Sequence, residues 1–335
     1  MAEVLPNARV ADGARPGRIG VFSVDASASR ALTAMRSIVA AHRVISFRTR
    51  APSGLLADAT LRDAADEIGR LSTAIGHRFA TFRLSAAGRE SRVMVAIRAA
   101  LRDRLGIDEG DGPAELALAL RRDGQDWSLL IRLSPRPSSS RRWRVRDYPG
   151  ALDATIAFAM HRLMDPVVDG TLVNLACGSG TLLIERGGDW TRSIGVDQSD
   201  EALVAASANL AASRRDRDVV LVRDALANLP ISSGTADGIV ADLPFGMLGE
   251  RVGLADLYGQ VFNEAARITQ AGARFIVVST RRRTMVELLD GNTNWREYRP
   301  SLTVSMPSRG GPITPRIFCL ERVAPESGIP VDGLR

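Results

Sequence analysis

The sequence predicts an α/β protein in which a parallel sheet with helices on both faces follows a smaller α+β module. Three observations predict this class. From Thr171 onward, short apolar runs typical of buried strands alternate with helical segments, which is the pattern of a parallel sheet. Before that point, helical periods are followed by a late hairpin. The two parts meet at a Pro- and Ser-rich linker, residues 135–140. We therefore expect domains at 1–140 and 141–325.

The composition indicates a globular chain with a polyanionic partner. The chain has 335 residues, 45% of them hydrophobic, which suffices for two domains with separate cores. Its 44 lysine and arginine residues outnumber 38 acidic residues, and every one of these cations is arginine. Compositional bias of the genome explains most of the missing lysine. The basic balance still favours a polyanion over a membrane surface.

Several features argue against secretion and membrane insertion. The two cysteines, Cys177 and Cys319, provide neither a disulfide framework nor zinc-type spacing. Residues 1–18 are polar and interrupted by proline, unlike a signal peptide. No apolar run approaches the length of a membrane span. We therefore expect a cytoplasmic protein that binds no metal and no membrane.

The front module is expected to contain three helices, an early strand and a late hairpin, after a loosely attached lead of about 25 residues. Helical spacing and alternation of apolar residues predict these elements. The helices are expected at 27–41, 61–75 and 95–105, and the strands at 44–50, 116–120 and 127–133, with a turn at Asp123-Gly124.

The second domain is organised around a strand and a glycine-rich turn. Leu172 to Leu175 is an apolar run, and the turn 178–180 (Gly-Ser-Gly) follows it. A helix expected from Thr181 would present free N–H groups to a polar or anionic ligand. A dinucleotide fingerprint would need glycine in place of Leu183, and a phosphate-binding P-loop would need a lysine. The turn therefore predicts a different nucleotide-type site.

A second strand places a carboxylate near this turn. The apolar run 194–196 ends at Asp197, which is 19 residues after Gly178. An acidic side chain at about this spacing can accept both hydroxyls of a ribose. The alternative is that Asp197 caps the Ala-rich helix that begins near residue 200.

A third strand, 238–241, leads into the motif that determines the chemistry. The Asp242 carboxylate and a backbone carbonyl of Leu243-Pro244 can each accept one N–H of an exocyclic amine, which turns its lone pair outward. Pro244 offers no competing N–H. Phe245 supplies a flat face on which a flipped base can stack. The alternative is a structural turn with Phe245 in the core.

The motifs N-L-A-C-G-S-G-T at 174–181 and D-L-P-F-G at 242–246 resemble those of amino-methyltransferases that use S-adenosylmethionine. They are most similar to those of the THUMP-containing RNA guanine-N2 methyltransferases, whose second motif is D-P-P-[YF] or D-x-P-[YF]-G. The resemblance covers roughly 141–321, and the front of the chain only loosely. It implies a Rossmann-like seven-stranded methyltransferase sheet behind a THUMP-like RNA-binding module.

The resemblance also implies the site residues. The catalytic ones would be Asp242, Leu243, Pro244 and Phe245. The residues that bind S-adenosyl-L-methionine would be Asn174, Ala176, Cys177, Gly178, Ser179, Gly180, Thr181, Asp197, Gln198, Asp224 and Ala225. Asp224 would bind the adenine amino group, and a surface aspartate is the alternative. The family usually has Asp where this chain has Asn174, so we expect weaker cofactor binding.

The remaining segments would complete the sheet. We expect strands at 219–222 and 274–279, a helix at 254–269, a closing hairpin of 302–306 and 316–320, and a disordered tail from 324. Two arginine-rich runs have two interpretations each. Residues 141–146, four arginines around a tryptophan, indicate either a phosphate-contacting junction or a solvated strand. Residues 281–283 indicate a solvated face or a phosphate contact.

The implied function is N2-methylation of a guanosine in tRNA. Three alternatives stay open: the same reaction on ribosomal RNA, exocyclic adenine (N6) methylation of DNA or RNA, and an RNA-binding protein whose cofactor site has decayed. The last alternative is suggested by Asn174, which stands where the family usually has Asp. The RNA, the nucleotide position and the oligomeric state are not specified by the sequence.

Overall fold

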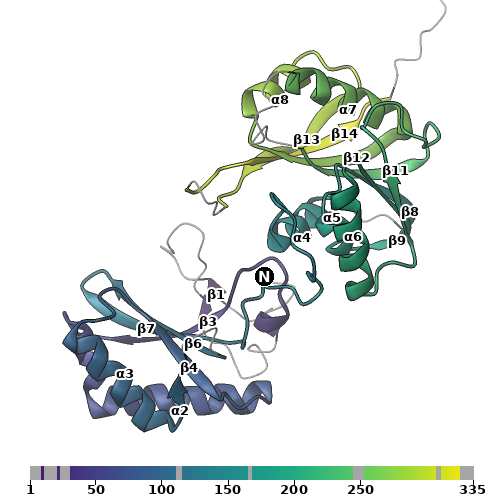
Figure 1. The fold of residues 1–335 in the computed structure, drawn as a ribbon. Helices are drawn as coiled ribbons and strands as arrows, with labels where there is room; N and C mark the ends of the chain where they lie inside the picture. Colours follow the sequence, from purple (N-terminus) through teal and green to yellow (C-terminus); the bar gives the residue numbers. More distant parts are fainter. Residues whose placement is uncertain are drawn as a thin grey trace, which may run out of the picture. The chain divides into compact units, whose positions relative to one another are not determined.

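The computed structural model describes residues 9–10, 21–22, 31–110, 115–164, 168–243, 253–306 and 311–324. The chain divides into two compact units, Met1–Ser140 and Arg141–Arg335. Each unit has its own sheet and its own hydrophobic core (Figure 1). Within the described residues, no helix has the length and apolar character needed to cross a membrane.

The first unit contains a five-stranded sheet in the order β3-β7-β6-β4-β5, with two helices packed on one face. A separate antiparallel pair joins β1 to β2. The elements are β1 (Arg9–Val10), β2 (Val21–Phe22), β3 (His42–Phe47), η1 (Pro52–Leu56), α2 (Asp58–Ile75), β4 (Thr81–Ser85), α3 (Arg92–Leu105), β5 (Asp108–Glu109), β6 (Leu116–Asp123) and β7 (Asp126–Arg132).

The apolar periods of the sequence become the buried faces of this unit. In α2, Leu61, Ile68 and Leu71 are buried, and the helix ends where Gly76 takes a φ of 66°, a left-handed conformation that favours glycine. The predicted helices at 61–75 and 95–105 and the late hairpin are confirmed. The helix expected over 27–41 is wrong in extent, because only 31–34 are helical within the described part of that range.

The second unit contains a seven-stranded sheet in the order β10-β9-β8-β11-β12-β14-β13. The first five strands in this order are parallel, and β14 runs antiparallel to both β12 and β13. The elements are α4 (Ala154–Leu163), β8 (Val168–Leu175), α5 (Thr181–Ile184), β9 (Asp189–Asp197), α6 (Asp200–Ser213), β10 (Val219–Arg223), β11 (Ala236–Asp242), α7 (Leu254–Ile268), β12 (Thr269–Ser279), α8 (Arg282–Leu289), β13 (Trp295–Thr303) and β14 (Arg316–Arg322).

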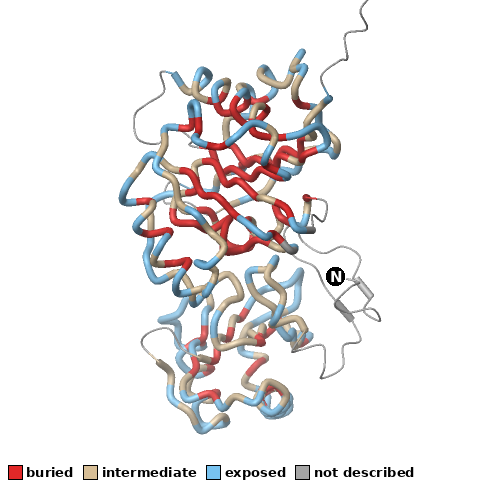
Figure 2. Tube along the Cα trace, turned by 90° about the vertical axis from the view of Figure 1, so that its right-hand side faces the viewer, coloured by how far each residue is buried: buried red, intermediate tan, exposed pale blue. Residues whose placement is uncertain are grey.

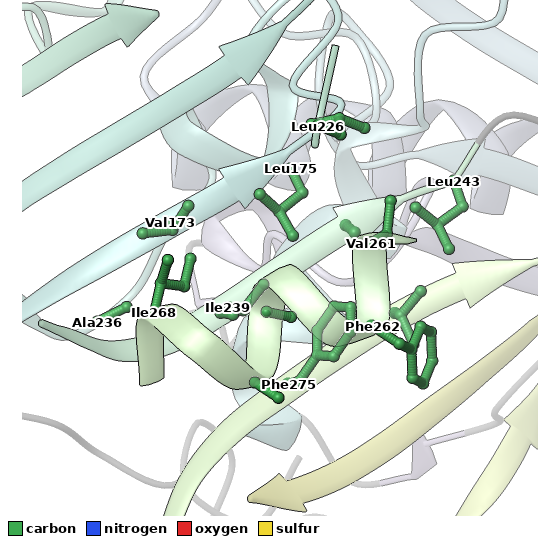
Figure 3. Packing of buried hydrophobic residues seen from close by; sticks show 14 of the residues in the cluster. Val173, Leu175, Leu226, Ala236, Ile239, Leu243, Val261, Phe262, Ile268 and Phe275 are labelled. Atoms are coloured by element: carbon green, nitrogen blue, oxygen red, sulfur yellow. The ribbon is translucent and has the colours of Figure 1, made fainter. Parts of the chain in front are cut away.

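The core of this unit lies on both faces of the central strands. Helices α7 and α8 cover one face, and α4, α5 and α6 cover the other (Figure 1). Buried residues are concentrated along the strands (Figure 2). On the α7 face, Leu175 and Ile239 pack with Phe262 and Phe275 (Figure 3). Each such large apolar side chain contributes about 1.5–3 kcal/mol when fully buried, so the core holds the strand ends rigidly.

The seven-stranded sheet confirms the predicted fold class, with two local differences. Strand β13 starts at Trp295, seven residues before the predicted strand at 302. It is an edge strand whose many exposed charged residues obscure the strand pattern. Helix α8 was not predicted, because its start lies in the arginine run 281–283. Strand β8 has β9, the next strand in sequence, on one side and β11 on the other. The carboxyl end of β8 is therefore a topological switch point, the kind of place where α/β proteins bind ligands.

Candidate cofactor and active site

The glycine turn that follows β8 has an unusual backbone, held in place by β9 and α6. Ala176, Gly178 and Gly180 have φ values of 51°, 52° and 81°. The Cys177 N–H donates to the Val196 carbonyl at 2.9 Å. A Cβ added to Gly180 would lie 3.3 Å from the Cβ of Ala206 on α6. The turn therefore needs glycine for its conformation and for its close approach to α6.

Asn174 provides a buried acceptor beneath this turn. Its side chain has no exposed surface, and Nδ2 donates to the carbonyls of Val240 at 3.1 Å and Leu175 at 3.2 Å. Because both neighbours are carbonyl oxygens, the nitrogen must face them. The Oδ1 atom is enclosed and has no hydrogen-bond partner among the described residues. An enclosed acceptor without a partner indicates a missing donor.

Asp197 ties the turn to the end of β9. Its Oδ2 accepts the Gly178 N–H at 2.8 Å, and its Oδ1 accepts the Ser199 N–H at 3.0 Å. Two carboxylate oxygens offer about four acceptor positions, so two positions remain for further donors. Ser199 caps α6, with its Oγ accepting the Ala202 N–H. The alternative role of Asp197 as the cap of α6 is therefore wrong.

The other predicted cofactor residues lie around the same strand ends. The Asp224 N–H donates to the Asp197 carbonyl at 3.0 Å, which joins the carboxyl end of β10 to that of β9. Asp224 is half-buried, whereas Gln198 and Ala225 are exposed. Of the turn residues, Cys177, Ser179, Gly180 and Thr181 are buried, and Ala176 and Gly178 are half-buried.

Asp242 lies at the end of β11, next to the strand that carries Asn174. Its Oδ1 is enclosed and has no hydrogen-bond partner within the described residues. Burial raises the pKa of Asp242 to about 7, because an apolar environment disfavours the charged form. Leu243 donates its N–H to the Val278 carbonyl at 3.2 Å and packs its side chain in the core (Figure 3). Pro244 and Phe245 lie outside the described residues.

Tyr258 and Ser279 form a buried hydroxyl pair that the sequence interpretation missed. Their oxygens are 2.8 Å apart, and the Ser279 Oγ also accepts the Arg281 N–H at 2.9 Å. Burial, together with the charge of Asp242, raises the pKa of Tyr258. An aromatic residue at helical spacing ordinarily indicates core packing, so the sequence contains no signal for this pair.

The arginine run 141–146 is not the solvated strand that was one of its two interpretations, because it contains no strand and two of its arginines point inward. The phosphate-contacting interpretation stays a prediction for the exposed Arg142 and Arg146. Arg141 and Arg144 turn into the second unit, where they bind the side chains of Glu185 and Thr181. Glu185 has no exposed surface. A carboxylate directly after the apolar run 181–184 was the one available signal for this ion pair. In the other run, Arg283 pairs with Glu287 on the exposed face of α8, which fits the solvated interpretation.

The seven-stranded α/β fold of the second unit is that of a class I methyltransferase. Residues 141–305, just under half of the chain, match the UPF0020 family, described as an RMKL-like methyltransferase domain. This part of the chain is therefore a methyltransferase domain.

Two kinds of relative refine this class. The chain is 28% identical over 129 residues to the mouse U6 snRNA (guanine-N(2))-methyltransferase THUMPD2, across 38% of this chain and 24% of the relative. It is 28% identical over 189 residues to the human tRNA (guanine(6)-N(2))-methyltransferase THUMP3, across 51% of this chain and 37% of the relative. The chain therefore spans well under half the length of these curated relatives.

The solved structures extend the likeness to both units. The crystal structure of TrmN from Thermus thermophilus matches with a TM-score of 0.73 and 21% identity, across 96% of this chain and 94% of that chain. A possible methylase from Clostridium difficile 630 matches with a TM-score of 0.65 and 14% identity, across 97% of this chain and 95% of that chain. At these identities the likeness shows a shared fold.

Proposed function

We propose that the protein transfers a methyl group from S-adenosylmethionine to the N2 amine of a guanosine in RNA, with tRNA as the expected substrate. The observation that carries this proposal is Asp242, a carboxylate whose enclosed oxygen has no partner in the described structure. It lies on the strand next to the one that leads into the glycine turn. The two curated relatives described above are both named as guanine-N2 methyltransferases of RNA.

The residues present fit S-adenosylmethionine. The enclosed Asn174 Oδ1 suits the ammonium group of the methionine part, because it is an acceptor without a donor. The two remaining acceptor positions of Asp197 suit the ribose hydroxyls, and the half-buried Asp224 suits the adenine amino group. When bound, the group supplies an electrophilic methyl on a sulfonium cation.

The protein's part in the transfer is orientation and charge. The enclosed oxygen of Asp242 accepts one N–H of the guanine amine, and a carbonyl of Leu243-Pro244 accepts the other. The nitrogen lone pair, otherwise delocalised into the ring, then faces the methyl group. As the nitrogen gains positive charge, the Asp242 carboxylate stabilises it, and with a pKa of about 7 it can hold the released proton. Phe245 provides the stacking face for the base.

The first unit would capture the RNA as a THUMP-like module. Two observations support this role: the relatives named THUMPD2 and THUMP3 are RNA enzymes, and the chain carries a formal net charge of +6. Arginine side chains neutralise phosphates and release counterions, which makes capture sensitive to salt.

The test is to incubate bulk tRNA, ribosomal RNA and DNA separately with radiolabelled S-adenosylmethionine and to identify the methylated nucleoside by chromatography. We expect label in N2-methylguanosine from tRNA. Label in ribosomal RNA alone would change the substrate, and label in N6-methyladenine would overturn the guanine assignment. Binding of cofactor and RNA without any transfer would establish the decayed site.

A further inference from the structure

Residues 141–146, here called the strap, open the second unit as a segment without helix or strand. One end of the strap is held by Glu185, the residue after α5. Arg141 donates from Nε and Nη2 to the two carboxylate oxygens of Glu185, at 2.8 and 3.1 Å, and the Trp143 Nε1 donates to the first of them at 3.0 Å. Because Glu185 is completely buried, this attachment is shielded from solvent.

The middle of the strap contacts the residue that directly follows the glycine turn. The Arg144 Nη2 donates to the Thr181 Oγ1 at 3.1 Å and to the Leu152 carbonyl at 3.0 Å. Its guanidinium carbon lies 5.0 Å from the centre of the Trp143 ring. Thr181 is the residue with which α5 begins. Arg144 therefore connects the strap to the first residue after the turn.

Asn209 of α6 makes a second connection. Its Oδ1 accepts the N–H groups of Val145 and Arg146, both at 2.9 Å. Its Nδ2 donates to the Arg146 carbonyl at 3.0 Å and to the Ser179 carbonyl at 3.1 Å. Asn209 has no exposed surface, and this single amide holds the strap and the turn together.

We propose that Arg144 and Asn209 are positioning residues for the methyl-donor site, because they attach the strap to Thr181, directly after the turn, and to Ser179 within it. The inference rests on the proposed function, since the donor is the ligand that the turn would bind. Three residues between β8 and α5 have positive φ, two of them in the turn, and such a backbone persists only where its surroundings over-determine it. Asp197 holds Gly178 from the β9 side, and Arg144 and Asn209 supply separate attachments at Thr181 and Ser179.

The test uses the full-length protein with Arg144→Ala, and Arg144→Lys as the conservative rescue. Titration calorimetry with S-adenosylhomocysteine gives the dissociation constant, and steady-state kinetics give KM for the donor and kcat. We expect Arg144→Ala to raise the dissociation constant and the donor KM about tenfold or more, with kcat at saturating donor within about twofold and RNA affinity unchanged. Arg144→Lys should recover part of the loss.

Asp218→Asn is the matched control. Asp218 pairs with the buried Arg186, which follows α5, and in the described part of the chain the side-chain hydrogen bonds of this pair go to each other and to the Leu183 carbonyl. This variant should lower the melting temperature while leaving the dissociation constant unchanged. A double-mutant cycle with Thr181→Val tests whether Arg144 acts through Thr181. The effect of Arg144→Ala on the dissociation constant should shrink when the Thr181 hydroxyl is absent.

Three results have distinct meanings. An unchanged donor affinity in Arg144→Ala, or fully additive effects with Thr181→Val, overturns the positioning role. Failure of the wild type to bind S-adenosylhomocysteine overturns the proposed function instead. If Arg144→Ala does not fold, Arg144→Gln removes the charge but keeps an amide N–H₂ group as donor, and it is assessed by the same two criteria.

Discussion

At the scale of single residues, Asp242 dominates the expected behaviour of the site. Burial raises the pKa of this carboxyl to about 7, so close to neutral pH both protonation states are populated. Only the carboxylate has both oxygens free to accept an N–H, whereas the protonated form uses one oxygen as a donor. The rate should therefore depend on pH in the physiological range.

We expect kcat/KM for methyl transfer to rise with pH and to level off above about pH 7, the value at which Asp242 ionises. The reason is that kcat/KM reports the ionisation of the free enzyme. Initial rates between pH 5.5 and 9 measure it. A profile that is flat across this range would show that the ionisation of Asp242 does not control transfer.

Asp242→Asn should slow single-turnover transfer by about a hundredfold or more, since one aligned polar group is lost. It should also raise the melting temperature at pH 8. The folded-state pKa lies above the ordinary value, so the native state binds this proton more tightly and loses that stability as pH rises through about 7. Above that pH the wild type buries a charge that the amide avoids. Calorimetry at pH 5 and pH 8 checks the sign, and a variant that melts lower at pH 8 contradicts it.

Asp197→Ala should weaken cofactor binding by about 1.5–3 kcal/mol or more, the range for hydrogen bonds to a charged group. The structure adds a second reason for the loss, because Asp197 also holds the Gly178 N–H. Asp197→Asn keeps one acceptor oxygen and should lose less. Titration calorimetry on both variants measures the difference, and equal affinity in Asp197→Ala and wild type would remove Asp197 from the site.

The residues that end apolar strands could be predicted from the sequence, and their local partners could not. Asn174, Asp197 and Asp242 each follow or end a run of buried strand residues. Because the carboxyl ends of parallel strands lie at the same edge of a sheet, these three residues could be placed at one edge from the sequence. The pairing of Glu185 with Arg141 depends on a segment 44 residues away. The carboxylate directly after the apolar run 181–184 indicated a buried partner, but no period or motif specified which residue it would be.

At the scale of elements, the strap is a piece of irregular structure whose side chains and backbone bind Glu185, Thr181 and Asn209 of the second unit. Strongly periodic elements such as α7 were predicted because their buried faces repeat along the chain. The strap has no period. Its conformation is set by side chains that meet only after folding, which is why charge alone suggested a solvated or phosphate-binding segment.

Arg141→Ala should destabilise the second unit by about 3 kcal/mol, because it leaves a fully buried carboxylate without its charge partner. Trp143 still donates one hydrogen bond to Glu185, which limits the loss. Urea denaturation followed by tryptophan fluorescence in a Trp127→Phe background reports only this unit, where the other three of the four tryptophans lie. The exposed Arg142 provides a matched control: Arg142→Ala should shift the midpoint little, and equal shifts would contradict a specific role of the pair.

At the scale of the whole molecule, the division between Ser140 and Arg141 suggests a division of labour. We expect a fragment of residues 141–335 to fold and to bind S-adenosylhomocysteine like the full chain, because the core and the strap are both retained. It should methylate full-length tRNA poorly at low RNA concentration, since the first unit would supply most of the capture. Equal turnover by fragment and full chain at the same salt would contradict this division.

The sequence predicts the larger sheet better than the smaller one. In the second unit, β8, β9 and β11 each contain an apolar run, and the resemblance of the motifs implies the seven-stranded sheet to which they belong. In the first unit, β3 pairs with β7 in antiparallel register, although more than half of the unit's sequence lies between the two strands. Pairing between short strands so far apart leaves no local pattern, and β4 is too short to stand out.

The position of the strap limits where a different N-terminal module could be joined to this unit, in evolution or by design. Because the linker is rich in proline and serine, its composition is that of an interchangeable spacer. From composition alone, a recombination breakpoint anywhere near it would be expected to be tolerated. A crossover that falls even a few residues after Arg141 would remove the ion pair to Glu185 and then the contacts to Thr181 and Asn209. If the strap positions the proposed donor site, recombination between modules preserves that site only when its breakpoint falls before Arg141.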